Sequence, residues 1–186
     1  STEQAVFDND VRIMQNELTV EKTGPRLSKA NTRLLFNASN SEISKAIDSL
    51  RIGYSKIYFY YSGHGWKGGI ETRDSTLATM TYRNLRDRLY LTEAKDFCVA
   101  IDACYAGTAK KVFQLSSEYK KRNTTLLMSS RADTTSLTKR IKINSSGERR
   151  KVGVFTWYFA ECHGDLAADN DDDGNLDEDD DDFDDN

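Results

Sequence analysis

The sequence predicts an α/β fold with a mainly parallel central sheet and helices on both faces. Two segments, 56–61 (KIYFYY) and 96–102 (DFCVAID), are rich in aromatic and β-branched residues without breakers, which is typical of buried strands. Segments in which apolar residues recur at helical spacing lie before and between them. Strands that alternate with helices favour parallel pairing, because each parallel connection must cross back over the sheet.

The first third of the chain predicts helix, strand and helix. Apolar residues recur at near-helical spacing over 6–18, with acidic residues near the start. A Thr-Gly-Pro turn follows at 23–25, and 32–36 (TRLLF) predicts a short buried strand. A second helix with one apolar face is expected over 40–50, ended by Gly53.

The rest of the chain continues the alternation. The strand at 56–61 runs into a glycine-flanked turn, and a helix is expected over 82–91. After the strand at 96–102, a third strand is expected at 126–129. Residues 139–151 predict a basic, flexible loop. The segment 154–162 (VFTWYFAEC) is apolar nearly all round and predicts a buried helix.

The composition fits one globular domain followed by an acidic tail. The chain has 186 residues, 38% of them hydrophobic, which is enough for one core of ordinary size. Residues 169–186 hold eleven Asp, one Glu and no Lys or Arg, so the formal charge of this segment is −12. Because the net charge of the whole chain is −4, residues 1–168 carry +8. That positive charge predicts a solvated surface, or one that binds an acidic partner or the tail itself. We expect a domain over 1–168 and a tail over 169–186.

Cysteine usage and hydropathy exclude several classes of protein. Three cysteines without a CxxC pair indicate neither a disulfide framework nor a zinc site. No apolar run approaches the roughly 18–20 residues that cross a membrane. The sequence favours the cytoplasm and leaves secretion open, and we expect neither nucleic acid nor a membrane as a partner.

Two motifs at the ends of predicted strands carry the chemistry. His64 lies between two glycines after the strand at 56–61, and Cys104 follows the strand at 96–102. A lone histidine or cysteine is most often structural, but ligands of parallel sheets bind beyond the carboxyl ends of the strands. Peptide cleavage by a thiol needs a thiolate, an imidazole to protonate the leaving amine, and N–H donors for the oxyanion. His64, Cys104 and the backbone N–H groups of Gly65 and Cys104 supply that set.

The two motifs resemble the paired signatures of caspase-like peptidases, most closely metacaspases, paracaspases and bacterial caspase-family proteins. The motifs are YSGHG at 61–65 and DACYAG at 102–107, and the Cys follows the His by 40 positions. Weaker likenesses extend the resemblance over most of the chain. It implies a caspase-like three-layer sandwich over 1–168 and a cysteine endopeptidase with a Cys-His dyad. It also implies a first strand ahead of the helix at 6–18, before residue 1.

The resemblance further implies a pocket for a basic side chain. Caspases proper have Gln two residues before the nucleophile and cut after Asp, whereas metacaspases and paracaspases have Asp there, as Asp102 is here, and cut after Arg or Lys. The relatives also use residues matched by Asp10 and Ser62. Two carboxylates in a partly dry pocket gain from a forked guanidinium. Asp133 is a third acidic candidate. The structural alternatives are a helix N-terminal charge for Asp10 and a turn former for Asp102.

Basic residues in the predicted loops are candidate self-processing sites. They lie in the linker after Cys104 and in the basic segment near 140–150, and a solvated basic loop is the alternative for each. The candidates are Lys110, Lys111, Lys120, Lys121, Arg122, Arg140, Arg149 and Arg150.

The acidic tail follows the D-x-D-x-D-G pattern of a calcium loop. Position 12 is Asp rather than Glu, which shortens the bidentate reach, and no full helix follows. A solvated acidic tail is the alternative to Ca²⁺ binding. The expected ligands are Asp169, Asp171, Asp173, Asp177 and Asp180.

The leading hypothesis is an endopeptidase that cuts proteins after Arg or Lys. It includes cleavage of the enzyme by itself and an influence of Ca²⁺ on its activity. It needs no cofactor for its chemistry, and an activating or regulatory protein is a further expected partner. The alternatives are a catalytically silent caspase-like scaffold, a calcium-sensing binding module, and a legumain-like enzyme that prefers Asn. Cys98 is expected in the core, and the Cys162–His163 pair is set aside because helix neighbours point apart.

Overall fold

The computed structural model describes residues 2–19, 27–74, 80–114, 122–142 and 149–164. The helices are α1 (Thr2–Thr19), α2 (Asn40–Asp48), α3 (Tyr82–Tyr90), α4 (Ala109–Gln114) and α5 (Val154–Gly164), with short 3-10 turns at Lys29–Asn31 and Ala106–Thr108. The strands are β1 (Lys56–Ser62), β2 (Gly65–Trp66), β3 (Gly69–Ile70), β4 (Met80–Thr81), β5 (Asp96–Asp102), β6 (Asn123–Met128), β7 (Thr138–Lys142) and β8 (Arg149–Gly153).

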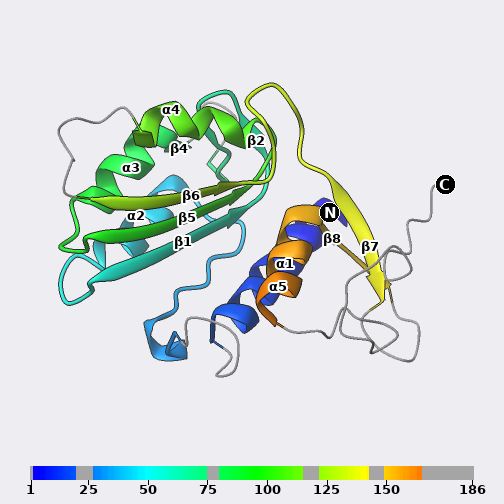
Figure 1. The fold of residues 1–186 in the computed structure, drawn as a ribbon, viewed down its shortest axis with the longest axis horizontal. Coiled ribbons are helices and arrows are strands. Elements are labelled where there is room, and N and C mark those ends of the chain that lie inside the picture. Colours follow the sequence, from blue (N-terminus) through cyan, green and yellow to red (C-terminus); the bar gives the residue numbers. More distant parts are fainter. Residues whose placement is uncertain (1, 20–26, 75–79, 115–121, 143–148, 165–186) are drawn as a thin grey trace.

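The main sheet is parallel and has the order β1-β5-β6, which confirms the predicted α/β class and all three central strands (Figure 1). The register of β1 on β5 runs without interruption from Lys56 opposite Asp96 to Ser62 opposite Asp102. Both strands therefore end at the same level, and the loops that follow them begin side by side.

One face of the sheet packs on α2, α3 and α4. Alternate residues of the strands point to this face, because successive strand side chains alternate sides. Ile57 of β1 and Phe97 of β5 join one buried cluster with Ile47 of α2 and Leu89 of α3. This cluster is the hydrophobic core, and it fixes β1 and β5 beneath their carboxyl-terminal loops.

The opposite face packs on α1 and α5, which lie side by side (Figure 1). Here the strands present polar side chains. The Tyr60 hydroxyl shares a hydrogen bond with the Thr156 hydroxyl of α5, and Ser62 donates to Asp10 of α1. The helices on both sides and the sheet between them form three layers.

Two of the predicted helices begin at capping residues. The Ser39 side chain accepts from the Glu42 N–H at 3.1 Å, and the Glu42 carboxylate accepts from the Ser39 N–H at 2.7 Å. This capping box starts α2. Thr81 is the N-cap of α3, and its side chain accepts from the Asn84 N–H. Both helices end slightly earlier than predicted.

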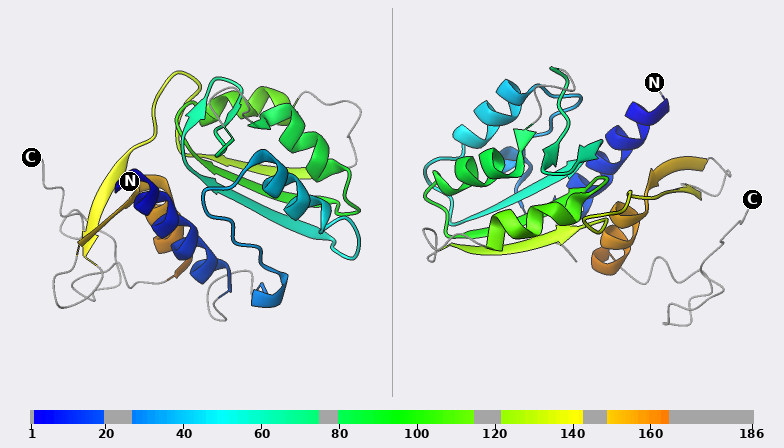
Figure 2. Two further views of the ribbon diagram at one scale, coloured as in Figure 1. Left: turned by 180° about the vertical axis from the view of Figure 1, so that it is seen from behind. Right: turned by 90° about the horizontal axis from the view of Figure 1, so that it is seen from above.

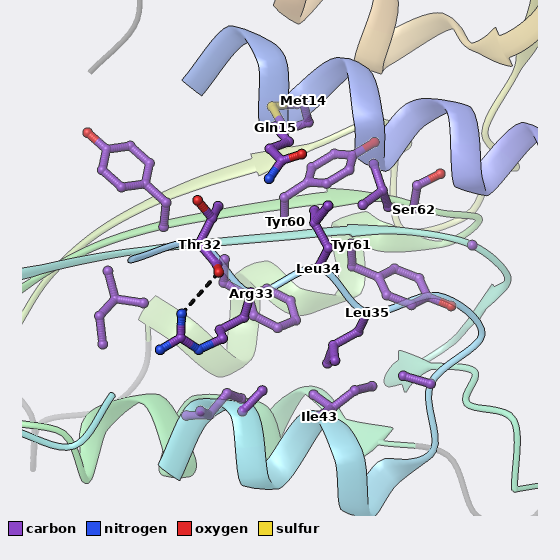
Figure 3. Close-up of a pocket in the computed structure, with 18 of the residues that line it drawn as sticks. Met14, Gln15, Thr32, Arg33, Leu34, Leu35, Ile43, Tyr60, Tyr61 and Ser62 are labelled. Carbon is purple, nitrogen blue, oxygen red and sulfur yellow. Dashed lines mark hydrogen bonds between the residues drawn. The ribbon is translucent and has the colours of Figure 1, made fainter. Parts of the chain in front are cut away.

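The prediction of a strand over 32–36 is wrong. This segment is irregular, and Leu35 and Phe36 remain 39% and 37% exposed. A strand needs a hydrogen-bonded neighbour, and none of the described strands pairs with this segment. Instead, a largely apolar groove of about 690 Å³ is lined by this segment, the open edge of β1, α1 and α2 (Figure 3).

The prediction of a flexible loop over 139–151 is also wrong. Residues of both ends form the antiparallel hairpin β7–β8, with Thr138 opposite Gly153 and Lys142 opposite Arg149. Figure 2 shows this hairpin standing on the α1–α5 side, away from the main sheet. Burial of Ile141 and Val152 explains why so polar a segment forms a ribbon.

The helix predicted over 154–162 is confirmed as α5, but its burial is less than predicted. Among its described side chains, Thr156 and Ala160 are buried, whereas Phe155 and Trp157 are half-buried. Only one flank of the helix faces the sheet, so its apolar sequence is not matched by an all-round contact. None of the helices in the described ranges has the length and apolarity to span a membrane.

Candidate active site

His64 lies in a turn between β1 and β2 whose backbone is firmly held. The Tyr61 hydroxyl donates to the carbonyl oxygens of His64 at 2.8 Å and of Glu71 at 2.9 Å. The Glu71 N–H also donates to the His64 carbonyl at 3.0 Å. The imidazole itself remains 54% exposed. The backbone of His64 is therefore fixed while its ring stays accessible.

Two side chains of α1 approach the imidazole. The Glu3 carboxylate oxygen lies 3.5 Å from Nε2 of His64. The ring of Phe7 meets the imidazole edge to face, with 5.2 Å between the ring centroids. Helix α1 therefore restricts the ring on one side.

Cys104 is the second residue of the loop after β5, and the backbone N–H groups of its neighbours donate hydrogen bonds. The Ala103 N–H donates to the Ser129 hydroxyl at 3.0 Å, and the Ala106 N–H to the Ser130 hydroxyl at 3.0 Å. The Tyr105 N–H donates to the Thr134 carbonyl at 2.8 Å. Within the described residues, the Cys104 N–H has no such acceptor.

Strained backbone marks the residue after the cysteine. Tyr105 has φ +57°, in the left-handed region that non-glycine residues seldom occupy. Such conformations persist where surrounding contacts enforce them, and they concentrate at functional sites. The half-buried thiol of Cys104 is thereby placed at a sharp turn rather than within a strand.

The histidine and cysteine loops are in direct contact. The Gly63 N–H donates to the Asp102 carbonyl at 3.1 Å. A Cβ added at Gly65 would lie 2.4 Å from the Cys104 carbonyl oxygen and 2.8 Å from Cβ of Ala103. Only glycine permits this approach. The structure thus brings the loops that carry His64, Gly65 and Cys104 together at the carboxyl ends of β1 and β5.

Asp10, Ser62 and Asp102 also come together, on the α1–α5 face directly below these loops. Asp10 accepts from the Ser62 hydroxyl at 2.6 Å and from the Gly153 N–H at 2.9 Å. Asp102 is the register partner of Ser62. A Cβ at Gly153 would lie 2.2 Å from an Asp102 carboxylate oxygen and 3.1 Å from one of Asp10. Both carboxylates therefore share the space beside one glycine.

This acidic pair is deeply buried. Asp10 is 1% exposed and Asp102 is 4% exposed. Burial raises the pKa of Asp10 to about 6, and the nearby Asp102 charge contributes in the same direction. The structural alternative for Asp10 fails, because Asp10 stands in the middle of α1 rather than at its start.

Sequence reasoning missed the residues that surround the pair. Ser136 donates to Asp102 at 2.7 Å, and the Thr156 hydroxyl donates to it at 2.7 Å. Burial, with the charges of Asp10 and Asp102, raises the pKa of Tyr60 well above its usual range. Ser136, Gly153 and Thr156 belong to segments with no recognisable motif, and only the chain fold brings them here.

The remaining predicted site residues lie elsewhere. Asp133 is exposed and pairs with Arg131 at 3.5 Å, so it does not join Asp10 and Asp102. Cys98 is half-buried in the middle of β5, where burial raises the pKa of its thiol. The predicted calcium-loop residues lie outside the described ranges. Within the described ranges, no three His, Cys, Asp or Glu side chains form a cluster that could hold a metal ion.

Aromatic and basic side chains border the site. Trp66, directly after the His64 turn, is 40% exposed. The Lys67 ammonium lies 5.7 Å from the ring centre of Tyr105, next to Cys104. Comparison with known proteins adds no assignment: no family model matches the chain, and neither does any curated protein.

Proposed function

We propose that the chain is a cysteine endopeptidase of the caspase-like kind that cuts proteins after Arg or Lys. The observation that carries this proposal is the contact between the His64 and Cys104 loops above the buried Asp10–Asp102 pair. The three-layer arrangement around a parallel sheet is compatible with a caspase-like sandwich, and the motifs at 61–65 and 102–107 resemble that family.

The chemistry follows from the groups present. Cys104 gives its proton to His64, and the thiolate attacks the peptide carbonyl carbon. The N–H groups of Cys104 and Gly65 then receive the oxyanion. As the C–N bond breaks, His64 protonates the leaving amine, and a thioester to Cys104 remains. Water activated by His64 hydrolyses that thioester and restores the thiol.

The acidic pair supplies the specificity. A guanidinium or ammonium at P1 would replace mutual repulsion of two carboxylates by attraction. An acidic P1 side chain would add a third negative charge in a dry space and be rejected. To make this contact, the P1 side chain must reach Asp10 and Asp102 beside Gly153.

The pair is closed from solvent by the segment that carries Ser136 and by β8. A P1 side chain enters only after one of these elements moves. We therefore propose that the described conformation is latent, as in a zymogen, and that substrate, processing or a partner opens the pocket. Binding energy spent on this opening lowers the affinity of the latent form for substrate.

The proposal is tested with matched fluorogenic peptides that end in Arg, Lys, Asp or Asn. Hydrolysis is measured for wild type and Cys104→Ala, each with and without Ca²⁺. Turnover of the Arg or Lys peptides that disappears in the variant supports both the dyad and the acidic pocket. Turnover of the Asn peptide alone would favour a legumain-like pocket. Arg cleavage that persists in Cys104→Ala would refute the proposed nucleophile.

A further inference from the structure

The turn between β2 and β3 comes directly after the His64 turn and is held against the loop that follows Cys104. The Gly68 N–H donates to the Thr108 hydroxyl at 3.2 Å, and the Tyr82 N–H of α3 donates to the Gly68 carbonyl at 2.9 Å. The β2–β3 turn is therefore fixed on the side of the sheet that α3 covers. The acidic pair lies on the other side, with α1 and α5.

Two side chains of this turn remain accessible beside the proposed nucleophile. Trp66 is 40% exposed, and a Cβ added at Gly68 would lie 3.7 Å from its ring. The indole therefore lies back over the turn and leaves part of its surface to solvent. Lys67 is exposed, and its ammonium lies 5.7 Å from the ring centre of Tyr105, the neighbour of Cys104. The turn thus presents an apolar ring and a cation side by side.

The Lys67 ammonium makes no ion pair with any residue that the structure describes. Glu3, whose carboxylate approaches His64, belongs to α1 and so comes from the opposite side of the sheet. A contact with the face of the Tyr105 ring leaves an ammonium able to bind a carboxylate as well, because the ring occupies only one side of it. Lys67 is therefore suited to an acidic group brought by a substrate.

The chemistry selects the substrate residue that meets this turn. His64 protonates the leaving amine, which is the backbone nitrogen of P1′, so the P1′ residue passes the imidazole. Successive side chains of an extended peptide point to opposite sides. Because the P1 side chain points to the acidic pair on the α1–α5 side, the P1′ side chain points to the α3 side, where Trp66 and Lys67 lie.

We propose that Trp66 and Lys67 form a subsite that selects Glu at P1′, so that Arg–Glu and Lys–Glu bonds are cut in preference. This inference rests on the proposed peptidase function. The P1′ carboxylate pairs with the Lys67 ammonium, while the methylene groups of the Glu side chain cover the exposed part of the indole. A basic residue at P1′ meets Lys67 with like charge and is disfavoured.

The experiment uses matched extended peptides with Arg at P1 and Glu, Gln or Lys at P1′, and mass spectrometry counts cleavage after the Arg alone. For wild type we expect kcat/KM of the Glu peptide to exceed that of the Gln peptide about three- to fivefold, the range of an exposed charge pair. The Lys peptide should be slower than the Gln peptide. High salt should reduce both differences, because exposed charges are screened.

Variants of the two side chains separate their contributions. Lys67→Glu should invert the order and make the Lys peptide the best of the three. Lys45→Glu makes the same change of charge at an exposed position of α2 and should keep the wild-type order. Trp66→Ala should slow the Glu and Gln peptides by a similar factor, because both side chains carry the same methylene groups. Wild-type order in Lys67→Glu, or an equal inversion in Lys45→Glu, would overturn the proposal.

Binding to the Cys104→Ala protein distinguishes failure of this inference from failure of the peptidase proposal. Equal turnover of the Glu, Gln and Lys peptides would overturn the subsite and leave the proposed peptidase function standing. If no peptide is cut, calorimetric titration of Cys104→Ala with the same peptides decides. Affinities in the order Glu, Gln, Lys that Lys67→Glu inverts would retain the subsite without the peptidase, whereas equal affinities or no binding would overturn it.

Discussion

Single hydroxyl and carboxyl groups hold the candidate site together. The Tyr61 hydroxyl bonds two carbonyls of the His64 turn, and Ser62, one residue later on the other face of β1, bonds Asp10. Strand alternation alone thus divides two neighbouring side chains between the dyad loop and the acidic pair. The Tyr61 ring packs against the core, whereas Ser62 faces α1.

Neutralising Asp10 should stabilise the fold and abolish cleavage after Arg. Its pKa is raised to about 6 from 3.8, so the folded state binds more protons than the unfolded state between these values. The protonated Asp10 carboxyl therefore contributes about 3 kcal/mol to the free energy of unfolding. This contribution is fully present below about pH 4 and is lost as the pH rises through 6. Asp10→Asn should recover about 1–2 kcal/mol of that at pH 7.5, measured by urea unfolding.

The same comparison at pH 4.5 is the control, because Asp10 is then largely protonated in the folded state. The stabilising effect of Asp10→Asn should shrink towards zero there. A variant that is equally destabilised at both pH values would mean that the carboxylate is held by its two hydrogen bonds more strongly than burial opposes it. That result would contradict the strained acidic pair.

Half-buried Tyr61 of β1 and buried Tyr82 of α3 should respond oppositely to removal of the hydroxyl. Tyr61→Phe loses two hydrogen bonds and should cost about 1 kcal/mol and lower kcat, because the His64 turn is released. The Tyr82 hydroxyl is buried without a partner among the described residues. Tyr82→Phe should therefore be neutral or stabilising by up to about 1 kcal/mol in thermal unfolding. A larger loss for Tyr82→Phe than for Tyr61→Phe would contradict this assignment.

At the scale of elements, the hydrophobic pattern of the sequence predicts the strands of the core correctly. It fails for segments at the periphery of the sheet. Strands β1 and β5 contribute Ile57, Phe97, Val99 and Ile101 to the core, and their aromatic and β-branched residues give a clear strand signal in the sequence. The segment 32–36 (TRLLF) is also largely apolar, yet strand formation depends on a partner strand that its own sequence does not specify. Its prediction failed for that reason.

The β7–β8 hairpin was missed for the opposite reason. Its strands hold six Lys or Arg residues, and only Ile141 and Val152 give a period-2 signal. Like charges opposite one another also oppose the pairing. Burial against α1 and α5 forms the ribbon despite its composition, which a local pattern cannot reveal.

The secondary structure also reduces the number of basic residues that are plausible sites of self-processing. A peptidase needs an extended, accessible substrate, but Lys110 and Lys111 lie in α4, and Arg140 and Arg149 lie in paired strands. We expect cleavage of active protein to fall first after Lys120 or Lys121, outside the described ranges. Mass spectrometry of the fragments tests this against Cys104→Ala. First cleavage after Lys110 or Arg140 would show that those elements open before processing.

At the scale of the whole molecule, the site could be anticipated only in part. His64 and Cys104 stand 40 residues apart, and their motifs together with the strand order placed them at one edge. Ser136, Gly153 and Thr156 reach Asp102 and Asp10 only because the chain folds back over α1. No spacing rule encodes that return, so the walls of the acidic pocket had to come from the structure.

The acidic tail should bind Ca²⁺ weakly through its calcium-loop pattern. The half-motif ends in Asp at position 12, so we expect a Kd of about 10⁻⁴–10⁻³ M by calorimetry on the full chain. Asp169→Asn/Asp171→Asn/Asp173→Asn should abolish the binding. Asp181→Asn/Asp182→Asn/Asp184→Asn removes the same charge outside the first ligand positions and should retain it. Equal losses would indicate a diffuse counterion effect instead of a site.

The most direct test of the account is covalent capture of the nucleophile by a peptide that carries an electrophile after Arg, located by mass spectrometry. We predict one adduct, on Cys104, which is absent from Cys104→Ala, retained in Cys98→Ala, and much slower with the matched peptide ending in Asp. An adduct spread over Cys98 and Cys162, or equal capture by the Arg and Asp peptides, would contradict the proposed dyad and its acidic pocket.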